Sequence, residues 1–130
     1  MIKVPIYWTK TFKTKPDQTI LVGMNWYRNA HYHDQSKWKR EFHEIIDNQC
    51  KNMTPIDGSY ILNIKIYYKN AACDGSNISS LIEKAVLDAL QSNGILVNDN
   101  VNYHLGTVWG VAGQDKENPR AEIEILPTQQ

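Results

Sequence analysis

The chain has 130 residues, 42% of them hydrophobic and 22% charged, with 14 basic residues balanced by 14 acidic ones. This length and composition predict one domain spanning residues 1–130 and exclude a disordered tail, a fibrous repeat and a disulfide-rich miniprotein. No apolar stretch approaches the roughly 20 residues of a membrane helix. Two cysteines and no signal-peptide pattern lead us to expect a cytoplasmic protein with reduced thiols.

The charges are segregated along the chain. Residues 1–52 hold nine Lys and Arg against five Asp and Glu, residues 53–72 hold two against one, and residues 73–130 hold three against eight. A basic part beside an acidic part is typical of a basic contact surface next to a carboxylate site. Chance also produces such asymmetry, so the charges alone decide nothing.

The first half of the chain combines short β-rich runs with one long periodic segment. Apolar residues at Trp38, Phe42, Ile45 and Ile46 follow helical spacing, and Asp34 or Ser36 is in position to cap this helix. In chain order we expect a strand at 2–9, a strand at 19–23, a polar aromatic loop at 25–37 and a helix at 36–53, which ends before Pro55.

The second half carries the clearest patterns. Strict alternation predicts a strand at 59–69, and apolar positions at helical spacing predict a helix at 78–92 that ends at Ser92-Asn93-Gly94. Closing strands are expected at 101–111 and 121–126, with a turn at 113–119 between them. The order β-β-α-β-α-β-β predicts an α+β fold, a mixed β-sheet with two α-helices packed on one face.

Polar residues gather around the second helix. Asp74 precedes it, Asp99 follows it, and Asn77, Lys84 and Asp88 share one edge of it. We expect the helix and its following loop to bring the carboxylates and the lysine together, because oxygen ligands beside a lysine suit Mg²⁺ and phosphoryl chemistry. The structural alternative is that Asp74 caps the helix, Lys84 and Asp88 form an exposed pair, and Asp99 makes a turn.

The central block resembles the RusA family of Holliday junction resolvases. The matching residues, in order and spacing, are Asp74-Gly75-Ser76-Asn77, Lys84, Leu87-Asp88-Ala89-Leu90, Gly94 and Asn98-Asp99. Two flanking segments are similar more loosely. Residues 24–29 look like the N-x-x-x-R loop of the family, and residues 115–125 look like its closing strand.

The resemblance implies a Mg²⁺-dependent endodeoxyribonuclease, with Mn²⁺ able to substitute, that resolves four-way DNA junctions as a homodimer in phage or prophage recombination and repair. It implies a RusA-like fold. The catalytic residues would be Asp74, Asp99 and Lys84. The metal ligands would be Asp74 and Asp99, with Asp88 and Ser76 as further candidates and Asn77 as a residue that supports them.

Two departures from the family pattern affect the metal ligands. Ser76 replaces the second aspartate of the D-x-D-N motif, and Asn98 replaces an aspartate before Asp99. The spacing from Asn77 to Lys84 is also about one helical turn longer than in short members. A second hypothesis is therefore a protein that binds branched DNA and is catalytically weakened or inactive. A third is a small α+β assembly protein without a nucleic-acid partner.

Basic and aromatic residues interleave around the predicted first helix. Basic groups neutralise phosphates, and aromatic rings such as Trp26, Tyr27, Tyr32 and Trp38 stack on unpaired bases. The alternative is a solvated loop whose aromatic side chains pack into the core or a dimer seam. The candidate DNA-binding residues are Asn25, Arg28, His31, Lys37, Lys39 and Arg40.

Overall fold

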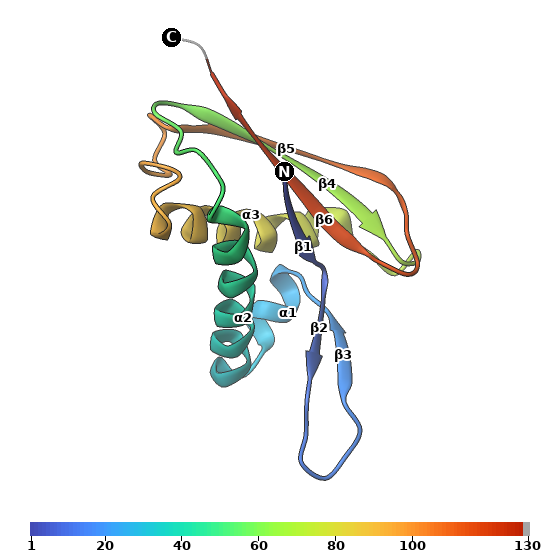
Figure 1. The fold of residues 1–130 in the computed structure, drawn as a ribbon. Helices are drawn as coiled ribbons and strands as arrows, with labels where there is room; N and C mark the ends of the chain where they lie inside the picture. Colours follow the sequence, from blue (N-terminus) through green and yellow to red (C-terminus); the bar gives the residue numbers. More distant parts are fainter. Residues whose placement is uncertain (129–130) are drawn as a thin grey trace.

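The computed structural model describes residues 1–128, which form six strands and three helices. Figure 1 shows their arrangement. In chain order the elements are β1 (Ile2–Pro5), β2 (Tyr7–Lys10), β3 (Gln18–Leu21), α1 (Met24–Asn29), α2 (Tyr32–Cys50), β4 (Tyr60–Tyr68), α3 (Gly75–Ser92), β5 (His104–Gln114) and β6 (Arg120–Pro127).

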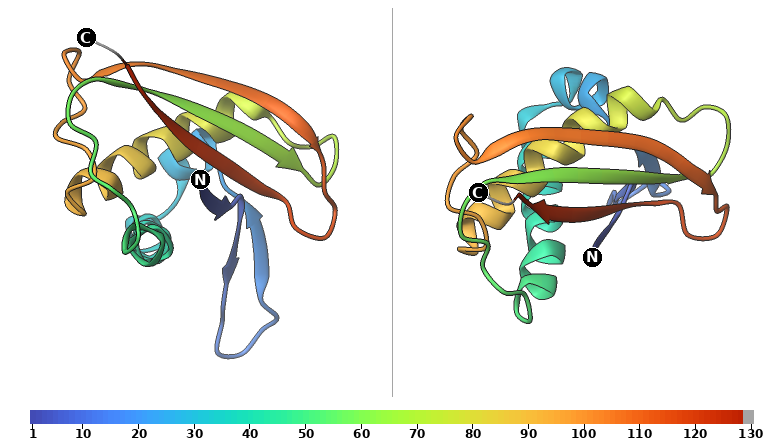
Figure 2. Two further views of the ribbon diagram at one scale, coloured as in Figure 1. Left: turned by 45° about the horizontal axis from the view of Figure 1, so that its top comes forward. Right: turned by 90° about the horizontal axis from the view of Figure 1, so that it is seen from above.

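Four strands form a mixed sheet in the order β1-β6-β4-β5. Strands β4 and β5 are parallel, and the other neighbours are antiparallel. The helices lie on one side of this sheet, and its other face is uncovered (Figure 2, left). α3 lies against β4 and β5, whereas α2 packs against α3 and β1. The expected α+β class with a mixed sheet is confirmed.

The core lies between α3 and the sheet, as the two strongest sequence patterns predict. On β4 every second side chain from Tyr60 to Ile66 is fully buried. The apolar face of α3 is buried from Ile78 to Leu90. The helix ends where expected, since Gly94 follows it with a φ of +71°, a left-handed conformation that suits glycine.

The N-terminal segment is two strands rather than the single one expected at 2–9. β1 pairs with β6 up to Pro5, and the carbonyl of Ile6 then accepts a hydrogen bond from the Val22 N–H at 3.0 Å. The chain thus leaves the main sheet and forms a separate two-stranded ribbon of β2 and β3. This ribbon, which we call the arm (residues 7–21), projects away from the body of the protein (Figures 1 and 2).

The loop expected at 25–37 is largely helical. It contains α1 and the first turn of α2, whose N-cap is His31 rather than Asp34 or Ser36. The His31 Nδ1 accepts a hydrogen bond from the His33 N–H at 3.2 Å. The six residues of α1 are too few to show a helical period, so pattern reading misses them. The element order therefore has one strand and one helix more than predicted.

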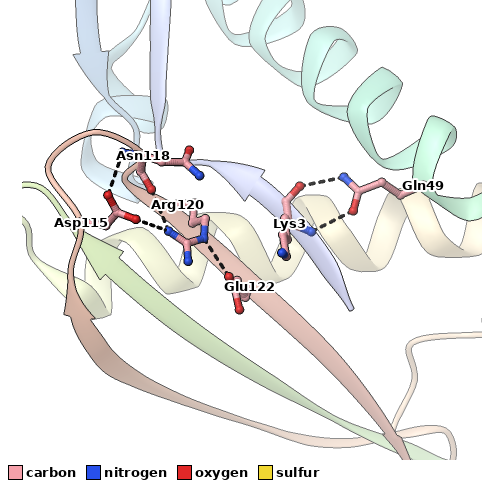
Figure 3. Close-up of polar contacts among 6 residues, drawn as sticks. All are labelled: Lys3, Gln49, Asp115, Asn118, Arg120 and Glu122. Carbon is pink, nitrogen blue, oxygen red and sulfur yellow. Dashed lines mark hydrogen bonds and ion pairs between the residues drawn. The ribbon is translucent and has the colours of Figure 1, made fainter.

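Two polar contact groups, drawn in Figure 3, hold the periphery of the sheet. The Gln49 side chain accepts from the Lys3 N–H at 2.9 Å and donates to the Lys3 carbonyl at 2.7 Å, which joins α2 to β1. Arg120 donates to Glu122 and to Asp115, both at 2.8 Å, and closes the turn between β5 and β6. The hydrogen bond from the Asn118 backbone N–H lowers the pKa of Asp115 the most, and the hydrogen bond from Arg120 lowers it further.

Candidate functional site

Asn77 joins the two segments that resemble family motifs. Its Oδ1 accepts a hydrogen bond from the Asn25 N–H at 2.8 Å, so the start of α1 is tied to the first turn of α3. Gly23 permits this approach, because a Cβ at that position would lie 2.4 Å from the Asn77 Nδ2. The side chain of Asp74 caps α3 by accepting from the Asn77 N–H at 3.3 Å. Asn77 therefore positions α1 beside Asp74.

Lys84 and Asp88 lie farther along α3, on the side that faces α1 and α2. A small hollow there is lined by Tyr27, Trp38 and Lys39 together with Lys84 and Asp88. The Lys39 Nζ is 3.8 Å from the Asp88 Oδ2. Asp88 is thus paired with a candidate DNA-binding lysine across the α2–α3 interface.

Asp99 lies in the loop that leads from α3 to β5. The Asn98 Oδ1 accepts hydrogen bonds from the backbone N–H groups of Asp99 and Asn100, at 2.8 and 3.0 Å. The hydroxyl of Tyr60, at the start of β4, donates to the Asn98 carbonyl at 2.7 Å. The pKa of Tyr60 is raised to about 12, mainly by burial and to a smaller extent by the nearby negative charge of Asp99. The loop is therefore fixed to the beginning of β4.

A single chain does not bring Asp74 and Asp99 together, so this expectation was wrong. Asp74 caps the first turn of α3 and Asp99 follows its last turn. A helix of 18 residues is about 27 Å long. Because β5 is parallel to β4, it begins beside the start of β4, and the chain runs back along α3 to reach that point. The two carboxylates therefore lie near opposite ends of α3.

The remaining candidate ligands do not complete a metal site in one chain. Lys84 lies ten residues from Asp74, which is about 15 Å along the helix, and Asp88 lies about 21 Å away. Ser76 is exposed in the first turn of α3. Within residues 1–128, no group of three or more His, Cys, Asp or Glu side chains is placed to hold a metal ion. In the described part of the chain, the candidate ligands therefore do not meet at a single site.

The candidate DNA-binding residues lie on an exposed surface made by α1 and the first half of α2. Four of them are exposed: Asn25, Arg28, Lys37 and Arg40. Among the described residues, no acidic side chain forms an ion pair with Arg28, Lys37 or Arg40. His31 is also exposed and caps α2, and Lys39 is exposed beside Asp88. These six residues lie in α1, in α2 or in the two residues between them.

Most of the interleaved aromatic side chains are packed against one another. The ring of Trp26 lies 6.3 Å from that of Tyr27 and 6.0 Å from that of Trp38. Trp38 is only 3% exposed. Tyr32 is the exception, since it is 63% exposed and its ring packs only against those of His31 and His33, at centroid distances of 5.1 and 4.1 Å. Of these four aromatic residues, Tyr32 alone is strongly exposed.

The arm adds basic residues that our sequence analysis did not select. It carries Lys10, Lys13 and Lys15 against a single acidic residue, Asp17. Lys15 lies over the ring of Phe12, with its Nζ 4.4 Å from the ring centroid. The sequence signal that could have identified this basic segment is the alternation of Lys and Thr before Pro16-Asp17.

An open hollow lies between the arm and α1. Its volume is about 520 Å³. Lys10 at its edge forms an ion pair with Asp34 of α2 at 2.7 Å, which fixes the arm relative to the helices. The arm and α1 thus border the same concave surface, and Lys10 is the basic residue among those that line it. The hollow is lined by Lys10, Gln18, Ile20, Asn25, Trp26, Asn29, Ala30 and Asp34.

No protein-family model matches the chain, and no curated protein matches it significantly. Within residues 1–128, no helix combines the length and the apolar character needed to cross a bilayer.

Proposed function

We propose that the protein is a metal-dependent endodeoxyribonuclease of the RusA type that acts on four-way DNA junctions in phage or prophage recombination and repair, in the cytoplasm. The observation that supports this most is the hydrogen bond from the Asn25 N–H to Asn77. It ties the start of α1, the helix that carries the exposed Arg28, to the first turn of α3, which Asp74 caps. DNA bound along α1 would therefore pass close to this carboxylate.

The basic residues bind the DNA in this proposal. Arg28, Lys37 and Arg40 neutralise phosphates from the helices, and the exposed lysines of the arm contact the DNA backbone elsewhere. Lys84 neutralises a phosphate farther along α3, because its distance from Asp74 exceeds one phosphate spacing. Tyr32 is available to stack on a base that is unpaired at the junction.

Mg²⁺, with Mn²⁺ able to replace it, would supply a polarised phosphate and an activated water. One chain separates Asp74 from Asp99, the two carboxylates that would hold the metal. What supports the proposal in this chain is the carboxylate of Asp74, which caps α3 in the turn to which α1 is tied.

A second candidate function is binding of branched DNA without cleavage. The separation of Asp74 from Asp99 along α3 favours it, as does the neutral side chain of Ser76 where the family pattern has an aspartate. In this case the basic surface has the same role and the carboxylates are a helix cap and a turn.

A cleavage assay distinguishes the two functions. An end-labelled four-way junction and a linear duplex of the same sequence are incubated with the protein in Mg²⁺, Mn²⁺ or EDTA, and the assay is repeated with Asp99→Asn. Metal-dependent paired nicks on the junction, lost in the variant, support the nuclease. Junction binding without nicks in either metal supports the binding protein, and the absence of salt-sensitive binding would contradict both.

A further inference from the structure

The hollow between the arm and α1 has walls from two different parts of the chain, which lie side by side (Figure 1). Cross-strand pairing in the arm places Trp8 opposite Ile20, and the next pair on the same face is Lys10 and Gln18. Because side chains alternate along a strand, these four share one face of the ribbon. That face is turned toward α1, since the ring of Trp8 lies 5.7 Å from that of Trp26.

The lining of the hollow combines apolar surface with free amide groups. Its apolar part comes from Ile20, Trp26 and Ala30, which are partly buried. Three exposed residues supply side-chain amides: Gln18, Asn25 and Asn29. Within residues 1–128, the amides of Gln18 and Asn25 form no hydrogen bond, and Asn29 uses only its Nδ2. An amide offers both donors and an acceptor, so these groups are available to a polar ligand.

The two charges in the hollow neutralise each other. The Lys10 Nζ lies 2.7 Å from the Asp34 Oδ2, and none of the other described residues that line the hollow is charged. A phosphate placed here would meet the carboxylate, and a metal ion would find a single carboxylate that is already paired. The lining therefore fits an uncharged ligand with apolar faces and hydrogen-bonding groups at its edge. A nucleobase has both features.

The size and the position of the hollow suit one base of a DNA strand. Its volume of about 520 Å³ lies within the range of about 300–1,000 Å³ that is usual for small-molecule sites. The hollow is open, so a base can enter while it stays attached to its strand. Asn25 in its wall donates its N–H to the Asn77 Oδ1 at 2.8 Å, and Asp74 caps the same turn of α3. A strand with a base in the hollow therefore runs close to that turn.

We propose that the hollow binds one unpaired nucleobase of the DNA and thereby sets the nucleotide preference of the protein at a junction. The inference rests on the proposed function, because it takes DNA as the ligand. The side chains of Trp26 and Ile20 pack against the base, and the three amides bind its edge. Stacking tolerates any base, whereas hydrogen bonds to the edge distinguish one base from another. Trp26 thus contributes affinity and the amides contribute selectivity.

Affinity for an unpaired base tests the site without metal or cleavage. Four-way junctions with one unpaired nucleotide at the branch point are made with each of the four bases and with an abasic analogue, and dissociation constants are measured in EDTA. We expect the base to improve affinity roughly fivefold to a hundredfold, as stacking of one base does. Equal affinity for all five junctions would overturn the inference and leave the proposed function standing, whereas no salt-sensitive binding of any junction would overturn both.

Two variants and a matched control assign the effect to the hollow. Trp26→Leu removes the ring and should bring the ratio of base to abasic affinity close to one. Gln18→Ala, at an exposed position without a side-chain hydrogen bond, leaves the fold intact and should change the order of the four bases. Thr19→Ala is the control, because Thr19 is the exposed neighbour on the opposite face of the ribbon.

The outcomes for these variants are read beside circular dichroism, because Trp26 also packs against Trp38. An unchanged ratio in folded Trp26→Leu would overturn the inference. An unchanged order of bases in Gln18→Ala, or an altered order in Thr19→Ala, would contradict reading of the base from this face of the arm.

A photochemical cross-link locates the bound base. The unpaired nucleotide carries 5-iodouracil, which on irradiation loses iodide and bonds to an aromatic side chain in contact with it, and mass spectrometry identifies the attached residue. We expect attachment at Trp26. Tyr32 is the alternative, since it is 63% exposed and does not line the hollow. Attachment at Tyr32 would place the base outside the hollow and overturn the inference, while the DNA-binding surface would stand.

Discussion

Replacing Gly23 with alanine tests the close approach of α1 to α3. The new Cβ would lie 2.4 Å from the Asn77 Nδ2 and 2.9 Å from its Cγ, well inside van der Waals contact. The backbone at Gly23 is extended, with φ −176°, so alanine itself is not strained there. The Asn77 side chain must move, and its 2.8 Å hydrogen bond with the Asn25 N–H is then lost.

The expected cost follows from these two effects. Overpacking costs about 1–3 kcal/mol, and loss of one hydrogen bond costs about 1 kcal/mol. The Gly23→Ala variant should therefore lose about 2–3 kcal/mol of unfolding free energy, whereas Asn77→Ala alone should lose about 1 kcal/mol. The double variant removes the clash, so it should be no less stable than Asn77→Ala.

Urea unfolding followed by tryptophan fluorescence measures all four proteins of this cycle. Trp26 lies in α1 and contacts Trp8 and Trp38, so the signal reports on the docking of α1. A coupling free energy of about 2–3 kcal/mol is expected. Strictly additive losses would refute the account, because Gly23 and Asn77 would then not be in contact.

Three further predictions concern the cap, a buried tyrosine and the arm. Asp74→Ala should lower the unfolding free energy by about 1 kcal/mol, and Asp74→Asn should change it little, because asparagine also caps helices; equal losses in urea unfolding would argue against the cap. Because burial raises the pKa of Tyr60 from 10.0 to about 12, the stability that it contributes is fully present below pH 10 and is lost as the pH rises through 12. Wild-type unfolding free energy should thus fall more steeply over this range than that of Tyr60→Phe. Replacing Lys13 and Lys15 with alanine should reduce the slope of log junction affinity against log salt by about 2, whereas Lys65→Ala, on the uncovered face of the sheet, should not alter it.

The parts of the fold that sequence predicted are those set by burial on a regular period. Tyr60 to Ile66 alternate between core and outer face, and Ile78 to Leu90 return to the core at helical spacing. Either pattern identifies its element without knowledge of the rest of the chain. The switch at Ile6 was not predictable in this way, because it depends on which distant strand accepts the chain.

The sequence offered candidate residues for the site but did not predict how they are arranged in space. The sequence reasoning assumed that residues close in the sequence are also close in space. It therefore expected one helix and its following loop to bring together Asp74, Lys84, Asp88 and Asp99. The parallel pairing of β4 with β5 decides otherwise, because it forces the chain to cross the length of the sheet before β5 begins. That pairing has no local signature, since the two strands are separated by 35 residues.

The most direct test of the central claim is cleavage of an end-labelled four-way junction by the wild type and by Asp74→Asn. The account predicts metal-dependent paired nicks on the junction by the wild type, none on a linear duplex of the same sequence, and none by the variant. Nicking that survives in Asp74→Asn would contradict it.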